Sequence, residues 1–156
     1  MKKRNIVFLV FAILTTAFIF SNSLQVAEVS SGQSGTIVKA IVQAAKSIKM
    51  NLPEEMLVTF VRKCAHITEF FLLGLFWSGV FITNGAKFLN RLIYVLFIGL
   101  FTACCDEFIQ FFVDGRGSLV SDVFIDFSGI VLAVLAGLLI EYSINRRRRR
   151  IHGPIR

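Results

Sequence analysis

The residues that could do chemistry fall into three short sets within long apolar runs. The first set is Arg62, Lys63, His66 and Glu69, in which Arg62, His66 and Glu69 are spaced i, i+4 and i+7. That spacing puts them on one face of a helix. A charged side chain that faces lipid costs about 2.5 to 3.5 kcal/mol at a helix centre. We therefore expect this face to look into a helix bundle or a wet cavity.

Two further sets of polar residues follow along the chain. They are Asp106, Glu107 and Gln110, and then Arg116, Asp122 and Asp126. Carboxylates and a histidine can transfer protons or bind a divalent ion, whereas Arg and Lys suit phosphate and carboxylate groups. Which chemistry applies depends on whether the helices bring the three sets together.

Composition points to a membrane protein. Of the 156 residues, 55% are hydrophobic and 17 are Phe, and the mean hydropathy is +0.71. The apolar residues form long runs instead of amphipathic stripes, which favours several membrane-spanning helices. No alternation of apolar and polar residues is sustained, as a β-barrel would need. We predict an all-α integral membrane protein with a single domain over residues 1–156.

Four transmembrane helices are expected in a bundle, at about residues 5–22, 62–83, 92–112 and 120–142. A hydrocarbon core about 30 Å thick takes about 20 helical residues, which fits these lengths. The first run could instead be a cleaved signal peptide, since Ser21-Asn22-Ser23 offers a small-x-small pattern.

Two more helical features are expected around these spans. Residues 36–50 alternate apolar and basic faces, which predicts an extracytoplasmic amphipathic helix in the interface between the first two spans. In the last span, Gly129, Ala133, Ala136 and Gly137 form a small-residue face, as close helix packing in lipid favours.

The positive charge indicates the orientation. The formal net charge is +7, and much of the excess lies in Lys2-Lys3-Arg4 and in the run of Arg146 to Arg150. By the positive-inside rule both termini, with a basic tail over residues 145–156, are expected in the cytoplasm, as is the basic loop over residues 84–91. Beside an apolar span, an Arg run serves as a stop signal attracted to anionic lipid, so no nucleic-acid partner is predicted.

This topology places all three polar sets at the depth of the outer leaflet, where we expect them to meet. In particular, Arg62 or His66 should lie within side-chain reach of Asp106 or Glu107. The three Cys residues show no ligand spacing and the expected spans contain a single His, so neither a metal nor a cofactor is predicted.

At these residues the chain resembles the VanZ-like family of bacterial membrane proteins. The resemblance rests on the segments Arg62-Lys63-Cys-Ala-His66-Ile-Thr-Glu69-Phe70, Asp106-Glu107-Phe-Ile-Gln110, Gly115-Arg116, Ser121-Asp122-Val123 and Asp126-Phe-Ser-Gly129, with Ser21 to Ser23 after the first span. Two positions depart from the family pattern: Phe70, where Tyr is more usual, and Asp114, where a residue such as Pro is expected. The resemblance implies a multi-pass protein of the bacterial cell membrane, linked to low-level resistance to teicoplanin, an acylated glycopeptide.

Three hypotheses for the polar sets follow. In the first, they bind an anionic or acylated envelope molecule, such as a lipoglycopeptide or a lipid-linked ligand, among the membrane lipids. The expected ligand-binding residues are Arg62, Lys63, His66, Glu69, Asp106, Glu107, Gln110, Arg116, Asp122 and Asp126. In the second, the protein is an intramembrane enzyme acting on a lipid-linked envelope substrate. His66, Glu69, Asp106 and Glu107 would then form an acid-base or metal site. In the third, ion pairs only hold the helices together.

Overall fold

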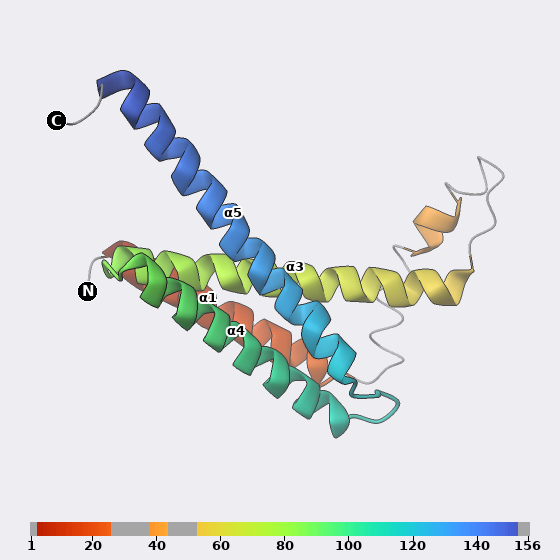
Figure 1. The fold of residues 1–156 in the computed structure, drawn as a ribbon. Helices are drawn as coiled ribbons and strands as arrows, with labels where there is room; N and C mark the ends of the chain where they lie inside the picture. The colour runs from red at the N-terminus through yellow and green to blue at the C-terminus, as the bar shows by residue number, and fades with distance from the viewer. Residues whose placement is uncertain (1–2, 26–37, 44–52, 153–156) are drawn as a thin grey trace.

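The computed structural model describes residues 3–25, 38–43 and 53–152, and the regular structure in these ranges is helical throughout (Figure 1). The long helices are α1 (Lys3–Ser23), α3 (Glu54–Thr83), α4 (Phe88–Phe111) and α5 (Val120–His152). All four are long and apolar enough to cross a membrane, the candidate span in α5 ending at Ile144. The predicted all-α class with four spanning helices is confirmed. Of the amphipathic helix predicted over residues 36–50, the structure describes only residues 38–43, which are helical; the rest of that prediction lies outside the described residues.

Local sequence explains where the helices begin and end. Pro53 is extended and precedes α3, and Glu54 and Glu55 occupy the first turn, where carboxylates offset the positive end of the helix dipole. This start adds about two turns before the span expected from residue 62. The turns after α3 and α4 contain Gly85 and Gly115, with φ of 75° and 74°, a conformation that favours glycine.

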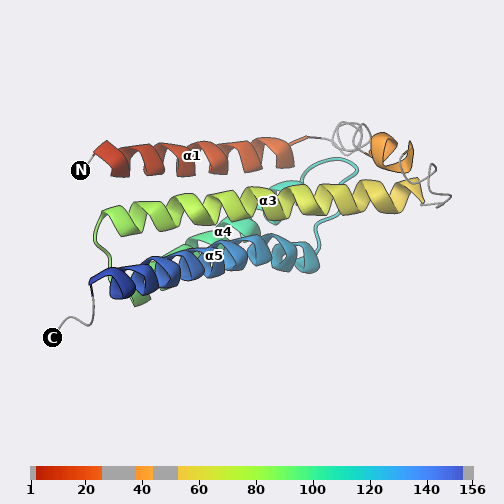
Figure 2. The same cartoon turned by 90° about the horizontal axis from the view of Figure 1, so that it is seen from above.

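Helix α3 is the centre of the bundle, since it packs against α1, α4 and α5, most extensively against α5. Figure 1 shows α5 crossing α3 at an angle, and Figure 2 shows α1 running alongside α3 on another side. The fully buried apolar core consists of Ile19, Phe70, Leu73, Val95, Ala103 and Ile130. Many other Phe, Leu and Ile side chains are exposed on the outside of the helices, as expected for a surface that faces lipid.

Small residues set the distance between α3 and α5. A Cβ atom added at Gly129 would collide with the carbonyl oxygen of Ile67 and lie 2.9 Å from the amide nitrogen of Phe71. A Cβ added at Gly74 would lie 2.7 Å from the Cβ of Ala133. The backbones therefore approach closely where the predicted small-residue face begins. Gly137, further along that face, would meet nothing within 4 Å.

Polar contacts also tie the helices together at the end opposite to the loop of residues 112–119. Asn5 is buried and donates a hydrogen bond from Nδ2 to the side-chain oxygen of Asn84. Arg91 donates to both carboxylate oxygens of Glu141, with Nη2 2.9 Å from Oε2. Neither contact was foreseen from the sequence.

Candidate functional site

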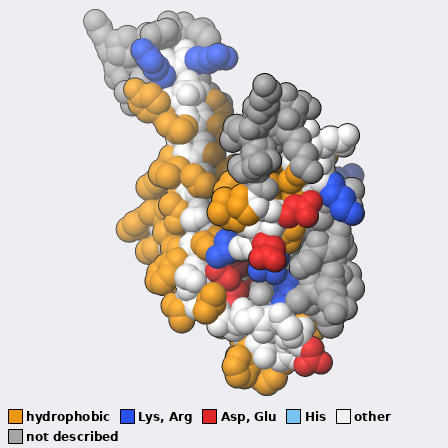
Figure 3. Space-filling model, turned by 90° about the vertical axis from the view of Figure 1, so that its right-hand side faces the viewer, with side chains coloured by type: hydrophobic (Ala, Val, Ile, Leu, Met, Phe, Trp, Pro, Cys, Tyr) orange, Lys and Arg blue, Asp and Glu red, His pale blue; other side chains and the backbone are white. Residues whose placement is uncertain are grey.

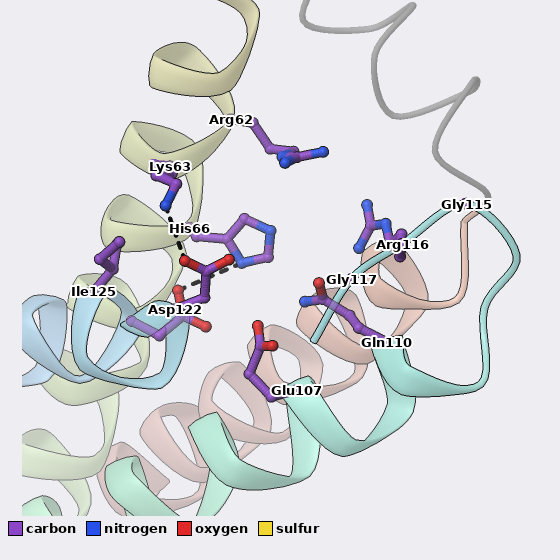
Figure 4. Close-up of a pocket in the computed structure, with 11 residues that line it drawn as sticks. Arg62, Lys63, His66, Glu107, Gln110, Gly115, Arg116, Gly117, Asp122 and Ile125 are labelled. Atoms are coloured by element: carbon purple, nitrogen blue, oxygen red, sulfur yellow. Dashed lines mark hydrogen bonds and ion pairs between the residues drawn. The ribbon is translucent and has the colours of Figure 1, made fainter. Parts of the chain in front are cut away.

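A polar pocket with a volume of about 80 Å³ lies at the end of the bundle that carries the loop of residues 112–119 (Figure 4). It is lined by Arg62, Lys63, His66, Glu107, Gln110, Gly115, Arg116, Gly117, Asp122, Ile125 and Asp126. These include eight of the ten ligand-binding residues expected from the sequence. The space is large enough for several water molecules or for the polar part of a ligand. Figure 3 looks onto this end, where acidic and basic side chains gather beside atoms that are not described.

The three polar sets meet because α3 passes the pocket at the place where α4 ends, the loop turns and α5 begins. Helix α3 brings the first set, α4 the second, and the loop with the start of α5 the third. The contact at Gly129 holds α5 against α3 beside Ile67, which puts Asp126, one turn earlier, next to His66. The predicted proximity of the first two sets is realised by His66 and Asp106, with 3.8 Å between Nδ1 and Oδ2.

Asp106 lies behind the pocket and is fully buried. Its Oδ1 accepts a hydrogen bond from the hydroxyl of Ser23, and its Oδ2 accepts one of 2.8 Å from Nε2 of Gln110. Ser23, from the end of α1, was not among the expected site residues. The signal that could have revealed it is its place in the polar triplet Ser21-Asn22-Ser23, directly after an apolar run at the depth of the three sets.

His66 stands between two carboxylates. Its Nδ1 is 3.8 Å from Oδ2 of Asp106 and 3.6 Å from Oδ1 of Asp126, both too long for hydrogen bonds. Within the described part of the chain, Nδ1 of His66 and Oδ2 of Asp126 are buried without a hydrogen-bond partner. The three residues offer one nitrogen and two oxygen atoms within 4.8 Å of one another, a group that could hold a metal ion. Spacing in the sequence could not reveal it, because each residue comes from a different helix.

The three cations around the pocket differ in how they are paired. Nζ of Lys63 lies 2.9 Å from Oδ1 of Asp122, and both side chains are partly exposed. No hydrogen bond or ion pair joins the Arg62 side chain to the described residues, and Nε and Nη1 of Arg116 are buried without a partner among them. Burial and the charge of Arg62 lower the pKa of the Arg116 guanidinium below its usual range. Since a guanidinium stays protonated in proteins, two positive groups face one pocket.

Glu107 and Glu69 have structural contacts: Glu107 lines the pocket and also holds the loop, whereas Glu69 points elsewhere. Glu107 accepts a hydrogen bond of 3.0 Å from the amide of Leu119, which fastens the loop to α4. Glu69 does not line the pocket; its Oε1 accepts a hydrogen bond of 2.9 Å from Nδ2 of Asn22 on α1. Asn22 is a second α1 residue that was not expected in the site. Glu69 therefore connects α3 to α1.

This arrangement supports two kinds of chemistry. The guanidinium groups of Arg62 and Arg116 reach into the same space from α3 and from the loop (Figure 4), and together they could bind an anion. Deeper in the pocket, His66 with Asp106 and Asp126 could bind a cation or exchange a proton.

Comparison with known proteins agrees with these motifs. A family model described as VanZ/LLP1 matches residues 8–141, a range that contains all the residues of the pocket. Comparisons with curated proteins and with solved structures gave no match. Because the family model covers well over half of the chain, including α3, α4 and the first turns of α5 that build the site, the protein belongs to the VanZ/LLP1 family.

Proposed function

We propose that this protein lowers susceptibility to lipoglycopeptide antibiotics such as teicoplanin by binding an anionic or acylated envelope molecule in its polar pocket. The observation that carries the proposal is the pair Arg62 and Arg116. Both line the pocket, and Arg116 has buried donors without a partner among the described residues. Two guanidinium groups that have no partner among the described residues repel each other at one site, so a phosphate or carboxylate between them would be strongly favoured.

The position of the pocket suits a ligand with an acyl chain. The Arg run of the tail and the basic turn before α4 belong to the opposite end of the bundle, and by the positive-inside rule this supports a pocket in the outer leaflet. This end of the bundle has exposed apolar side chains, which include Phe60 on α3, Leu119 in the loop and Phe124 on α5. An acyl chain could lie against them while the polar part of the ligand enters the pocket.

The experiment compares Arg62→Lys and Arg116→Lys with Arg146→Lys, a matched change in the exposed tail. Lysine keeps the charge but loses the planar two-point contact with an anion. We expect both pocket variants to lose protection against teicoplanin while their membrane abundance and thermal stability in detergent stay normal. The control should protect like the wild type. We call the binding of an anion between Arg62 and Arg116 the anion clamp. Full protection by both pocket variants at normal abundance would rule it out.

An intramembrane enzyme acting on a lipid-linked envelope substrate is the second candidate, favoured by the position of His66 between Asp106 and Asp126. A glutamine at position 66 keeps a hydrogen-bonding group but cannot exchange a proton near neutral pH. If the protein is an enzyme, His66→Gln should abolish protection while ligand binding persists. If it only binds, protection and binding should change together.

A further inference from the structure

Two buried carboxyl groups lie at and behind the inner wall of the pocket, and among the described residues neither forms an ion pair with a Lys or Arg side chain. The side chains of Asp106 and Asp126 are 0% and 3% exposed, and Oδ2 of Asp126 has no hydrogen-bond partner in the described ranges. A buried carboxylate is costly unless a charge or a metal compensates it. The nearest candidate partner, Nδ1 of His66, is beyond hydrogen-bonding distance of both.

The distances between these atoms fit a shared cation better than direct hydrogen bonds. Zinc binds His nitrogen and carboxylate oxygen at about 2.0 to 2.2 Å, so neighbouring ligand atoms in a tetrahedral site lie about 3.4 Å apart. The Nδ1 atom of His66 is 3.6 Å from the Asp126 oxygen and 3.8 Å from the Asp106 oxygen. The three ligand atoms lie within 4.8 Å of one another, so a small carboxylate rotation would complete the site.

The surroundings resemble those of an established metal ligand set. Ser23 and Gln110 hold the Asp106 carboxylate in place by hydrogen bonds, the kind of support that orients metal ligands. His66 and Asp126 also line the pocket, so a cation there would have an open side. Three protein ligands with one open position are typical of zinc sites that bind a further molecule.

The charge count points the same way. Without Glu69, which bonds to α1, the expected site residues include four carboxylates and three Lys or Arg side chains, which leaves one negative charge when all are ionised and His66 is neutral. Charge at this depth in a membrane protein is expected to be compensated. A bound cation would offset this excess of negative charge.

We propose that His66, Asp106 and Asp126 form a binding site for a divalent transition-metal cation at the floor of the pocket. The imidazole ligand favours zinc, and the two carboxylates also suit manganese, whereas magnesium and calcium prefer oxygen ligands alone. The cation site stands on its own geometry and does not depend on the proposed antibiotic protection.

The test uses the full chain, purified in detergent and stripped with a chelator. Metal content and thermal unfolding are measured with Zn²⁺, Mn²⁺ and, for comparison, Mg²⁺. We expect saturable binding of one Zn²⁺ or Mn²⁺ per chain, a rise in the unfolding temperature on binding, and a much weaker response to Mg²⁺. Asp126→Asn should weaken metal binding by at least about 100-fold. Mutating a residue that only hydrogen-bonds to a metal ligand already lowers metal affinity by about 10- to 100-fold, and Asp126 would be a ligand itself.

Asp114→Asn is the matched control, because Asp114 is an exposed carboxylate in the neighbouring loop. It should bind metal like the wild type. Asparagine nearly preserves the shape of aspartate, and the unfolding temperature without metal shows whether Asp126→Asn is folded. If the Asp126→Asn variant does not fold, His66→Gln provides the second ligand substitution.

Two results would overturn the cation site: absence of saturable binding by the wild type, or equal binding by the wild type and a folded ligand variant. The Arg variants distinguish this outcome from failure of the anion clamp. Metal binding by Arg62→Lys and Arg116→Lys at wild-type affinity supports an independent cation site, whether or not these variants still protect. If the wild type binds no metal and protection still requires both Arg residues, the anion clamp is supported and the cation site is refuted.

Discussion

Replacing Gly129 by Ala tests the contact that assembles the site. The added methyl group would collide with the carbonyl oxygen of Ile67 and approach the amide nitrogen of Phe71 to 2.9 Å. These are backbone atoms of α3, so no side-chain rotation can relieve the contact. Reaching an ordinary separation of about 3.5 Å requires the two helices to move apart by about 1 Å.

The loss of folding stability in Gly129→Ala can be estimated from two opposing effects. Overpacking a close contact costs about 1 to 3 kcal/mol, and a contact against backbone belongs at the upper end. Alanine recovers about 1 kcal/mol because it has a higher helix propensity than glycine. The net loss is about 2 kcal/mol, or about 4 to 8 °C in unfolding temperature for a chain of this size.

Gly137→Ala is the matched control on the same helix. A Cβ there meets nothing within 4 Å, so only the gain in helix propensity remains, and the unfolding temperature should rise by about 2 to 4 °C. Thermal unfolding of both variants in one detergent measures the difference. Protection against teicoplanin should fall in Gly129→Ala, because separating the helices moves Asp126 away from His66. Equal unfolding temperatures for the two variants would refute the close-packing argument.

Two further predictions concern the buried partner of Asp106 and the topology. Ser23→Ala should destabilise the protein by about 1 to 3 kcal/mol, because it leaves Oδ1 of Asp106 buried without its hydrogen bond, whereas Ser121→Ala at an exposed position should change stability by less than about 0.5 kcal/mol. Unfolding of both variants in detergent measures this, and a loss in Ser121→Ala as large as in Ser23→Ala would contradict it. In a background without native cysteines, an impermeant thiol reagent applied outside the cell should label Ser118→Cys and miss Gly85→Cys; the reverse pattern would invert the assigned orientation.

The sequence predicted the spans well because lipid imposes a simple rule. A helix that crosses a hydrocarbon core must be apolar for about 20 residues, and that length is visible without a structure. Charge within such a run must face the interior, so depth alone brought His66 and Asp106 together as candidates. The expected small-residue face was accurate at Gly129 and Ala133, where α3 packs, but Gly137 makes no such contact.

The predicted depth of each residue in the membrane could not show which polar side chains pair with each other. Each polar residue has several neighbours at the same level, and the rotation of each helix decides which it meets. Thus Lys63 pairs with Asp122, while Glu69 turns away from the pocket toward Asn22 on α1. The contribution of α1 was missed because its only polar signal near this depth is a short Ser-Asn-Ser triplet, which also suits a loop or a cleavage site.

The half of the bundle away from the pocket favours binding over conduction. Below the pocket, Ile19, Phe70, Leu73 and Ile130 form a fully buried apolar layer contributed by α1, α3 and α5. The charged pair Arg91 and Glu141 lies at the far end, beyond this layer, and its two groups are bonded to each other. An ion or proton would have to cross that layer without a polar group among the core residues that form it, at a high desolvation cost. A pocket closed on this side suits a ligand that enters and leaves at the pocket's own end of the bundle, which is the behaviour that the proposed function requires.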